Sequence, residues 1–178
     1  MKIATGASFC SIYESPVHAS FIRPFDASDV HALLETVPRG FLRDLEAIYL
    51  LGGTRRQQKT SRGRLFRYGA YGDGVIAINA FPRDLLREPY RHLPAPHVVN
   101  DYRRIGAEFV PDRHGWILRF CPRSLRRFYL YDVLLHEIGH HVDRFHPDRC
   151  TRRAERYAEW FASKHGRQHR RCRGVDVP

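Results

Sequence analysis

Hydrophobic residues recur every three to four positions between Ser124 and Phe145, which predicts an amphipathic helix of about 20 residues. The helix-breaking sequence His146-Pro147-Asp148 follows it. A second helix is predicted from Thr151 to His165, with Gly166 as its stop and residues 167–178 as a loose basic tail. The first helix would pack through Phe128, Tyr131, Leu134, Leu135, Ile138, Val142 and Phe145, and the second through Ala154, Tyr157, Ala158, Phe161 and Ala162.

The preceding part of the chain favours strands. Leu65–Tyr68 and Val75–Asn79 are β-prone runs joined by residues 69–74, whose Asp-Gly pair indicates a hairpin turn. Residues 41–51 change from a helical to an apolar, β-prone pattern before Gly52-Gly53, and residues 116–120 form one more strand candidate. A short helix is predicted over residues 28–35, with Ser28 as its cap. Residues 1–24, 54–63 and 82–115 are interpreted mainly as irregular.

These elements predict an α+β domain in which a small twisted sheet packs on a long helix followed by a second helix. At 178 residues the chain fits one domain. We assign an N-terminal segment to residues 1–24, the domain to residues 25–166 and the basic tail to residues 167–178.

The chain is strongly basic, with 30 Lys and Arg against 19 Asp and Glu and a net charge of +11. Such an excess raises nucleic acid as a partner and favours an acidic or nucleic-acid-bound protein target. The arginines are scattered, however, so an ordinary solvated surface explains most of them. No apolar run approaches a membrane span. The first twenty residues do not resemble a signal peptide, so a cytoplasmic protein is expected, although export as a toxin or effector by another route stays open.

The sequence His136-Glu137-Ile138-Gly139-His140 lies inside the long predicted helix. Positions i and i+4 share one helix face, so both imidazoles can point at one metal ion. Two neutral histidines suit Zn²⁺, which in catalytic sites has three protein ligands and one water. Glu137 can then act as the general base toward that water. The four cysteines contain no C-x-x-C pair, which excludes a cysteine-based zinc site.

A third ligand is expected from the second helix, which carries Glu155 and Glu159. If the two helices pair antiparallel, Glu155 comes level with His140 and completes the coordination of one Zn²⁺. Glu159 then comes level with His136 and accepts its remaining ring N–H, an outer contact that orients the ligand. The reverse assignment, with Glu159 as the ligand, remains open.

HEIGHHVD followed by ERYAEWFA resembles the glutamate-zincin metallopeptidases, and is most similar to the catalytic domain of anthrax lethal factor and the Pro-Pro endopeptidases. That group pairs H-E-x-x-H-x-x-D with E-x-x-x-E on the next helix. The resemblance covers about residues 130–165 and implies a minimal zincin-like fold. It also implies that the first glutamate, Glu155, binds zinc and that the second, Glu159, supports it.

The resemblance further implies that a strand such as Val75–Asn79 (Val75, Ile76, Ala77, Ile78 and Asn79) pairs with an extended substrate. It implies a tyrosine before the ligand helix that supports the oxyanion, but no tyrosine lies between His141 and Ala154. His146 and Tyr157 are the substitutes considered. We therefore expect a zinc-dependent metallopeptidase that acts on a protein or peptide. The alternative is a zinc-containing protein without catalysis that regulates a partner or binds nucleic acid.

Overall fold

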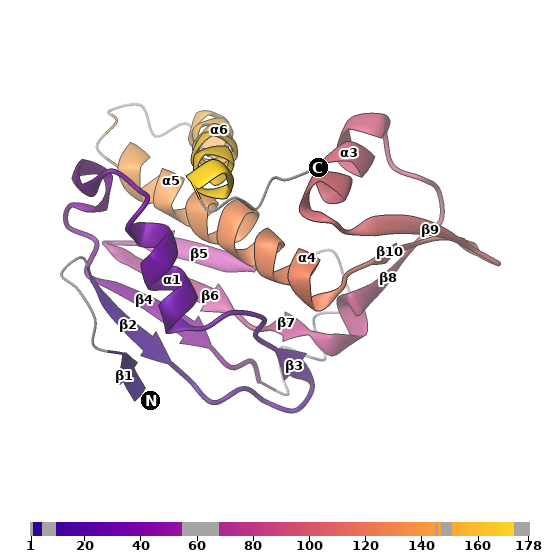
Figure 1. Ribbon diagram of the computed structural model, residues 1–178, viewed down its shortest axis with the longest axis horizontal. Helices are drawn as coiled ribbons and strands as arrows, with labels where there is room; N and C mark the ends of the chain where they lie inside the picture. Colours follow the sequence, from indigo (N-terminus) through magenta and orange to yellow (C-terminus); the bar gives the residue numbers. More distant parts are fainter. Residues whose placement is uncertain (1, 5–9, 55–67, 145, 147–150, 173–178) are drawn as a thin grey trace.

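The computed structural model describes residues 2–4, 10–54, 68–144, 146 and 151–172, with side chains for 10–54, 68–144, 146 and 151–167. It confirms the α+β class. One five-stranded sheet carries helices on one side, and a smaller three-stranded sheet with its own helix lies beside them (Figure 1).

The main sheet has the strand order β1-β2-β4-β6-β5. Its parallel centre is formed by β2 (Ser11–Glu14), β4 (Ala47–Leu51) and β6 (Val75–Asn79). Two antiparallel strands flank this centre, β1 (Lys2–Ala4) on β2 and β5 (Gly69–Gly72) on β6. Alternate residues of the central strands are buried, and the core-facing ones include Ile12, Ile48, Leu50, Ile76 and Ile78.

The long predicted helix is one continuous run in three parts, shown in orange in Figure 1. It comprises α4 (Pro122–Arg127), a π-helical segment η3 (Phe128–Leu134) and α5 (Leu135–Asp143). Leu134, Leu135 and Ile138 are completely buried, as the period predicted, and share a core with the sheet. The cap differs, because Cys121 caps α4 and Ser124 lies inside the first turn.

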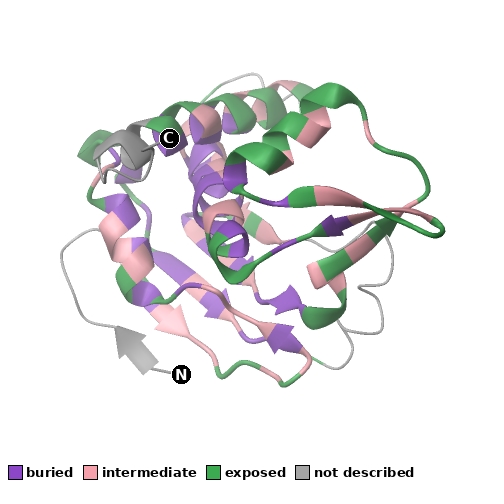
Figure 2. Ribbon diagram, turned by 45° about the vertical axis from the view of Figure 1, so that its right-hand side comes forward, coloured by how far each residue is buried: buried purple, intermediate pink, exposed green. Residues whose placement is uncertain are grey.

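Helix α6 (Thr151–Cys172) packs across α5 (Figure 1), and the buried residues gather where the helices meet the main sheet (Figure 2). Ala158, Phe161 and Ala162 of α6 are buried, as predicted. Gly166 does not end the helix, which continues to Cys172. A Cβ atom at Gly166 would have only moderately close contacts. The prediction of a loose tail is therefore wrong for residues 167–172. Helix α1 (Ala27–Leu34) matches the predicted short helix, but its cap is Asp26 rather than Ser28.

Residues 82–115 are not irregular, which corrects the prediction. They contain η2 (Arg83–Leu86), β8 (Arg87–Tyr90), α3 (Pro96–Ile105) and β9 (Glu108–Asp112). With β10 (Gly115–Arg119), the strand predicted near 116–120, they form the antiparallel sheet β8-β10-β9. The prolines of this stretch favoured an irregular structure in the sequence analysis. In the structure, however, Pro96 starts α3, and Pro89 and Pro111 lie in the outer strands β8 and β9, where proline is tolerated.

Residues 1–24 were also predicted to be irregular, and this is wrong where the structure describes them. Besides β1 and β2, they include β3 (Phe21–Ile22), which pairs with β7 (Phe81–Pro82). Residues 39–42 form a 3₁₀ turn, η1 (Arg39–Leu42), before β4. The predicted loop at 54–63, apart from Thr54, and most of the predicted strand at 65–68 lie outside the described residues. Among the described helices, none is both long enough and apolar enough to cross a membrane.

Candidate metal centre

Helix α5 presents His136 and His140 on one face, as the i, i+4 spacing requires. Their Nε2 atoms lie 3.1 Å apart, and both side chains are mostly buried. Glu137 lies beside them on the buried part of the same helix. The sequence motif is thus assembled on one helical turn, with all three side chains facing the region between α5, α6 and β5.

Gly139, inside the motif, lets α6 approach α5 closely. A Cβ atom at this position would lie 2.7 Å from Cα of Ala158, which is well inside contact distance. The close crossing places Glu155 of α6 opposite the two histidines. Its carboxylate oxygens lie 3.3 Å from Nε2 of His136 and 3.5 Å from Nε2 of His140.

The three side chains can hold a metal ion. In a tetrahedral zinc site with bonds of about 2.1 Å, ligand atoms are about 3.4 Å apart. The two Nε2 atoms are 3.1 Å apart, and each lies 3.3 or 3.5 Å from a different oxygen of Glu155, so one donor atom from each residue falls within 4.8 Å of the others and a small adjustment brings them to this spacing. Two imidazoles and one carboxylate are also the donor types that suit zinc.

The protonation of these groups fits the same chemistry. Burial lowers the pKa of His136, and the nearby His140 lowers it further, so the imidazole is neutral near pH 7 and keeps a nitrogen lone pair for a metal. Burial raises the pKa of Glu137 to about 7, with a further contribution from the negative charge of Glu155. A carboxyl group with such a pKa can both accept and return a proton at neutral pH.

The edge strand β5 passes directly over Glu137. A Cβ atom at Gly69 would lie 2.6 Å from Oε1 and 2.8 Å from Cγ of Glu137. Only glycine therefore leaves room for the carboxylate where it lies. This contact helps to bury Glu137, and it is possible because β5 has a glycine at this position.

A cavity of about 1000 Å³ opens beside His136, His140 and Glu155. Its walls come from α5, the start of α6, the β5–β6 hairpin and the turn before β4. The part of the wall that the structure describes is acidic although the chain is basic, because its described residues carry six carboxyl groups and one guanidinium, that of Arg144. The six belong to Asp44, Glu46, Asp73, Glu137, Asp143 and Glu155.

Glu159 lies apart from the three donor atoms. It lines a second hollow of about 600 Å³ between α3, η3 and α6, together with His136. Its charge acts on His136 by raising the pKa, against the lowering by burial. Among the described side chains, the metal-compatible cluster contains Glu155 and not Glu159, and no hydrogen bond joins Glu159 to His136 as the sequence suggested.

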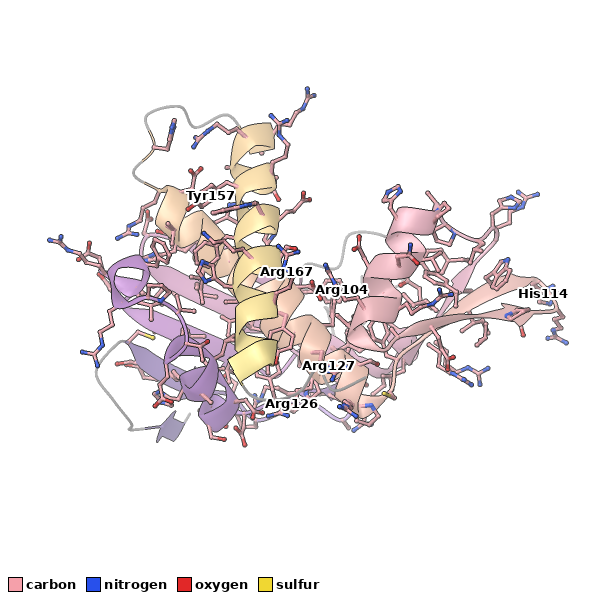
Figure 3. All side chains as sticks on the ribbon, turned by 45° about the horizontal axis from the view of Figure 1, so that its top comes forward. Arg104, His114, Arg126, Arg127, Tyr157 and Arg167 are labelled. Carbon is pink, nitrogen blue, oxygen red and sulfur yellow. The ribbon has the colours of Figure 1, made fainter. Side chains whose placement is uncertain are left out.

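The two predicted oxyanion donors lie in different surroundings. His146 is exposed and lines the larger cavity, where it can reach a bound substrate. Tyr157 lies on α6 (Figure 3). Its ring packs against Trp160 and Phe161 of the same helix, and it is not among the residues that line the two cavities. Its ring thus takes part in the packing of α6, and its role as a donor stays a prediction.

The predicted substrate-pairing strand, Val75–Asn79, is β6, and it cannot accept a further strand. β4 pairs with one side of β6 over its whole length and β5 pairs with the other side. Among the described strands, the edge of the sheet beside the site is β5 (Gly69–Gly72), which the sequence analysis treated as part of a turn. The turn itself is confirmed at Asp73-Gly74, where both residues have positive φ.

Sequence reasoning also missed three other features of the site. Gly69 gave no signal beyond its small size, and the carboxyl groups of Asp44 and Glu46 come from a turn about 90 residues before the histidines. Asp143 forms an ion pair of 2.9 Å with Arg153 of α6, across the two helices. The alternation of apolar and polar residues carries no information on such long-range neighbours.

Comparison of the chain with models of known protein families, with curated proteins and with solved structures gives no match. The functional interpretation therefore rests on the geometry of the site and on the sequence motifs that form it.

Proposed function

We propose that this protein is a zinc-dependent metallopeptidase of the zincin type. The observation that carries the proposal is the position of Glu137. A buried carboxyl with a pKa raised to about 7 lies next to three donor atoms within 4.8 Å of one another, on the wall of an open cavity. A purely structural metal site has no use for such a base.

In the proposed reaction His136, His140 and Glu155 hold the zinc ion. When bound, zinc would polarise the scissile carbonyl and lower the pKa of a water molecule. Glu137 accepts a proton from the attacking water as the new C–O bond forms. It then donates this proton to the amide nitrogen as the C–N bond breaks, so that the base is regenerated. His146 lines the same cavity, and in the proposed reaction it donates a hydrogen bond to the developing oxyanion.

The substrate is an extended peptide that pairs with β5, which is the end strand of the main sheet among the described residues. Peptides bind sheet edges through main-chain hydrogen bonds, and β5 combines an available edge with a position beside Glu137. The acidic cavity favours basic side chains in that peptide, although the net charge of the chain alone suggested an acidic target. Local charge at the cavity decides binding, because distant surface charges are screened within about 8–10 Å.

The test measures zinc per chain and cleavage of a degenerate peptide library by the wild-type protein and matched variants. Glu137→Gln should keep one zinc and lose cleavage by a factor of about 100 or more. Glu155→Gln should lose zinc, whereas Glu159→Gln, one helical turn further on, serves as the matched control and should keep it.

Other outcomes are equally informative. A wild-type protein without zinc would refute the proposal, and loss of zinc in Glu159→Gln alone would move the third ligand to that residue. Stoichiometric zinc with no cleavage of any peptide would favour the alternative, a zinc-containing protein without catalysis.

A further inference from the structure

His141 follows the ligand His140 in the chain but serves a different part of the fold. Its side chain is completely buried, and its Nε2 lies 2.9 Å from the carbonyl oxygen of Arg43, in the turn before β4. Its ring also meets the ring of Tyr71 from β5 edge to face, with centroids 5.3 Å apart. One side chain of α5 therefore contacts both the turn and the edge strand that enclose the cavity.

Arg144, the residue at the C-terminal cap of α5, strengthens the first of these contacts. Its guanidinium donates to the carbonyl oxygens of His141, at 2.6 Å, and of Arg43, at 2.7 Å. It also forms an ion pair of 3.1 Å with Asp44, whose positive φ turns the chain toward β4. The turn is thus attached to α5 through two side chains.

The turn before β4 is also attached to the β5–β6 hairpin. The N–H of Glu46 donates to the carbonyl oxygen of Gly74 at 2.8 Å, and the N–H of Gly74 donates to the hydroxyl of Tyr71 at 3.3 Å. A Cβ atom at Gly74 would lie 2.9 Å from the carbonyl oxygen of Asp44, so the two segments are in close contact. Since Tyr71 packs on His141, the contacts form a closed ring.

We propose that His141 is a positioning residue that sets where the edge strand β5 lies relative to the metal ligands. This inference rests on the proposed function, in which β5 binds the peptide. His141 is covalently next to His140 and touches β5 through Tyr71, so the ring of contacts transmits the position of the ligand helix to the substrate strand. His141 acts on the substrate only through β5 and the turn, without touching it.

The hydrogen bond distinguishes this role from simple packing. A leucine at position 141 would fill much of the same volume but could not donate to the carbonyl oxygen of Arg43. A glutamine keeps an N–H donor at similar reach. His141→Leu and His141→Gln are therefore a matched pair. His165→Leu is the control, because His165 is also a buried, ring-stacked histidine, but it lies on α6 between Phe41 and Phe161.

The first measurement is hydrogen–deuterium exchange of residues 69–74 in the zinc-loaded protein, which needs no substrate. His141→Leu should speed exchange of this segment by about ten-fold, because one buried hydrogen bond is lost. His141→Gln should restore it, and His165→Leu should leave it unchanged. Zinc content should stay at the wild-type value in all three variants. If His141→Leu does not fold, Tyr71→Leu breaks the same closed set of contacts from the β5 side and should speed exchange of residues 69–74 to the same extent.

The second measurement uses the library peptide that the wild-type protein cleaves fastest. His141→Leu should raise KM about ten-fold with a much smaller change in kcat, the pattern of weakened substrate binding. Unchanged exchange at 69–74, loss of zinc, or a fall in kcat at constant KM would overturn the positioning role. If the wild-type protein cleaves no peptide, the proposed function fails, and the exchange experiment alone decides whether His141 positions β5.

Discussion

The substitution Gly69→Ala tests the contact between the edge strand and the catalytic carboxylate. The added Cβ would lie 2.6 Å from Oε1 and 2.8 Å from Cγ of Glu137, and 3.0 Å from Cγ1 of Val133. Ordinary contact begins near 3.4 Å, so either the carboxylate or the strand must move by about 0.8 Å. The three nearest atoms belong to Glu137 and Val133 and not to a proposed zinc ligand, so we expect the ligands to stay in place.

The expected effect is a large loss of turnover with zinc retained. Misplacing a catalytic group by about 1 Å costs roughly 100-fold in rate. We therefore expect kcat to fall about 100-fold in Gly69→Ala while zinc content stays at the wild-type value. The displaced carboxylate also becomes more solvated, so its pKa should fall from about 7 toward the usual range of glutamate.

Gly72→Ala is the matched control. It lies on the same strand, and a Cβ atom there would have no neighbour within 4 Å. The assay is kcat on the best library peptide with zinc per chain measured on the same samples. A Gly69→Ala enzyme as active as Gly72→Ala would refute the reasoning, and so would a loss of zinc, which would mean that β5 supports the ligands rather than the base.

Three further predictions concern the helices and the cavity. Gly139→Ala should push α6 away from α5 at Ala158 and withdraw Glu155 from the histidines. Zinc binding, measured by competition with a chelator, should weaken by about ten-fold or more. A variant with full zinc affinity would contradict the close crossing of the two helices. Cleavage of peptides with basic side chains should be favoured, and this preference should fall as salt rises from 0.05 to 0.5 M in matched rate measurements; a salt-independent preference would argue against the acidic wall. Burial lowers the pKa of His165, so the neutral form of its ring is favoured in the folded protein. The free energy of unfolding should therefore be full above about pH 6.5 and fall as the pH drops below that value. The loss amounts to about 1.4 kcal/mol for each unit by which the pKa differs between the folded and unfolded states. Chemical unfolding at several pH values checks this, because His165→Phe should remove that part of the pH dependence.

The regular C-terminal helices were predictable because their apolar residues follow the helical period closely. Leu134, Leu135 and Ile138 are buried as expected, and the i, i+4 histidines meet at one point for the same geometric reason. Helix α3 was missed although Val98, Tyr102 and Ile105 follow the helical period, because the prolines around it led the whole stretch to be interpreted as irregular. Strand β5 was missed because Gly-Ala-Tyr-Gly lacks the β-branched residues that mark strands.

The sequence by itself determined which chemical groups are available and their local spacing. Two histidines on one helical turn, a glutamate between them and the Asp73-Gly74 turn all depend on neighbours a few residues away. Tertiary structure alone decided which glutamate meets the histidines, which strand ends the sheet beside Glu137, and that the cavity of a basic chain is acidic. These features depend on contacts between segments up to about 100 residues apart, such as His141 with Arg43, and local pattern carries no record of them.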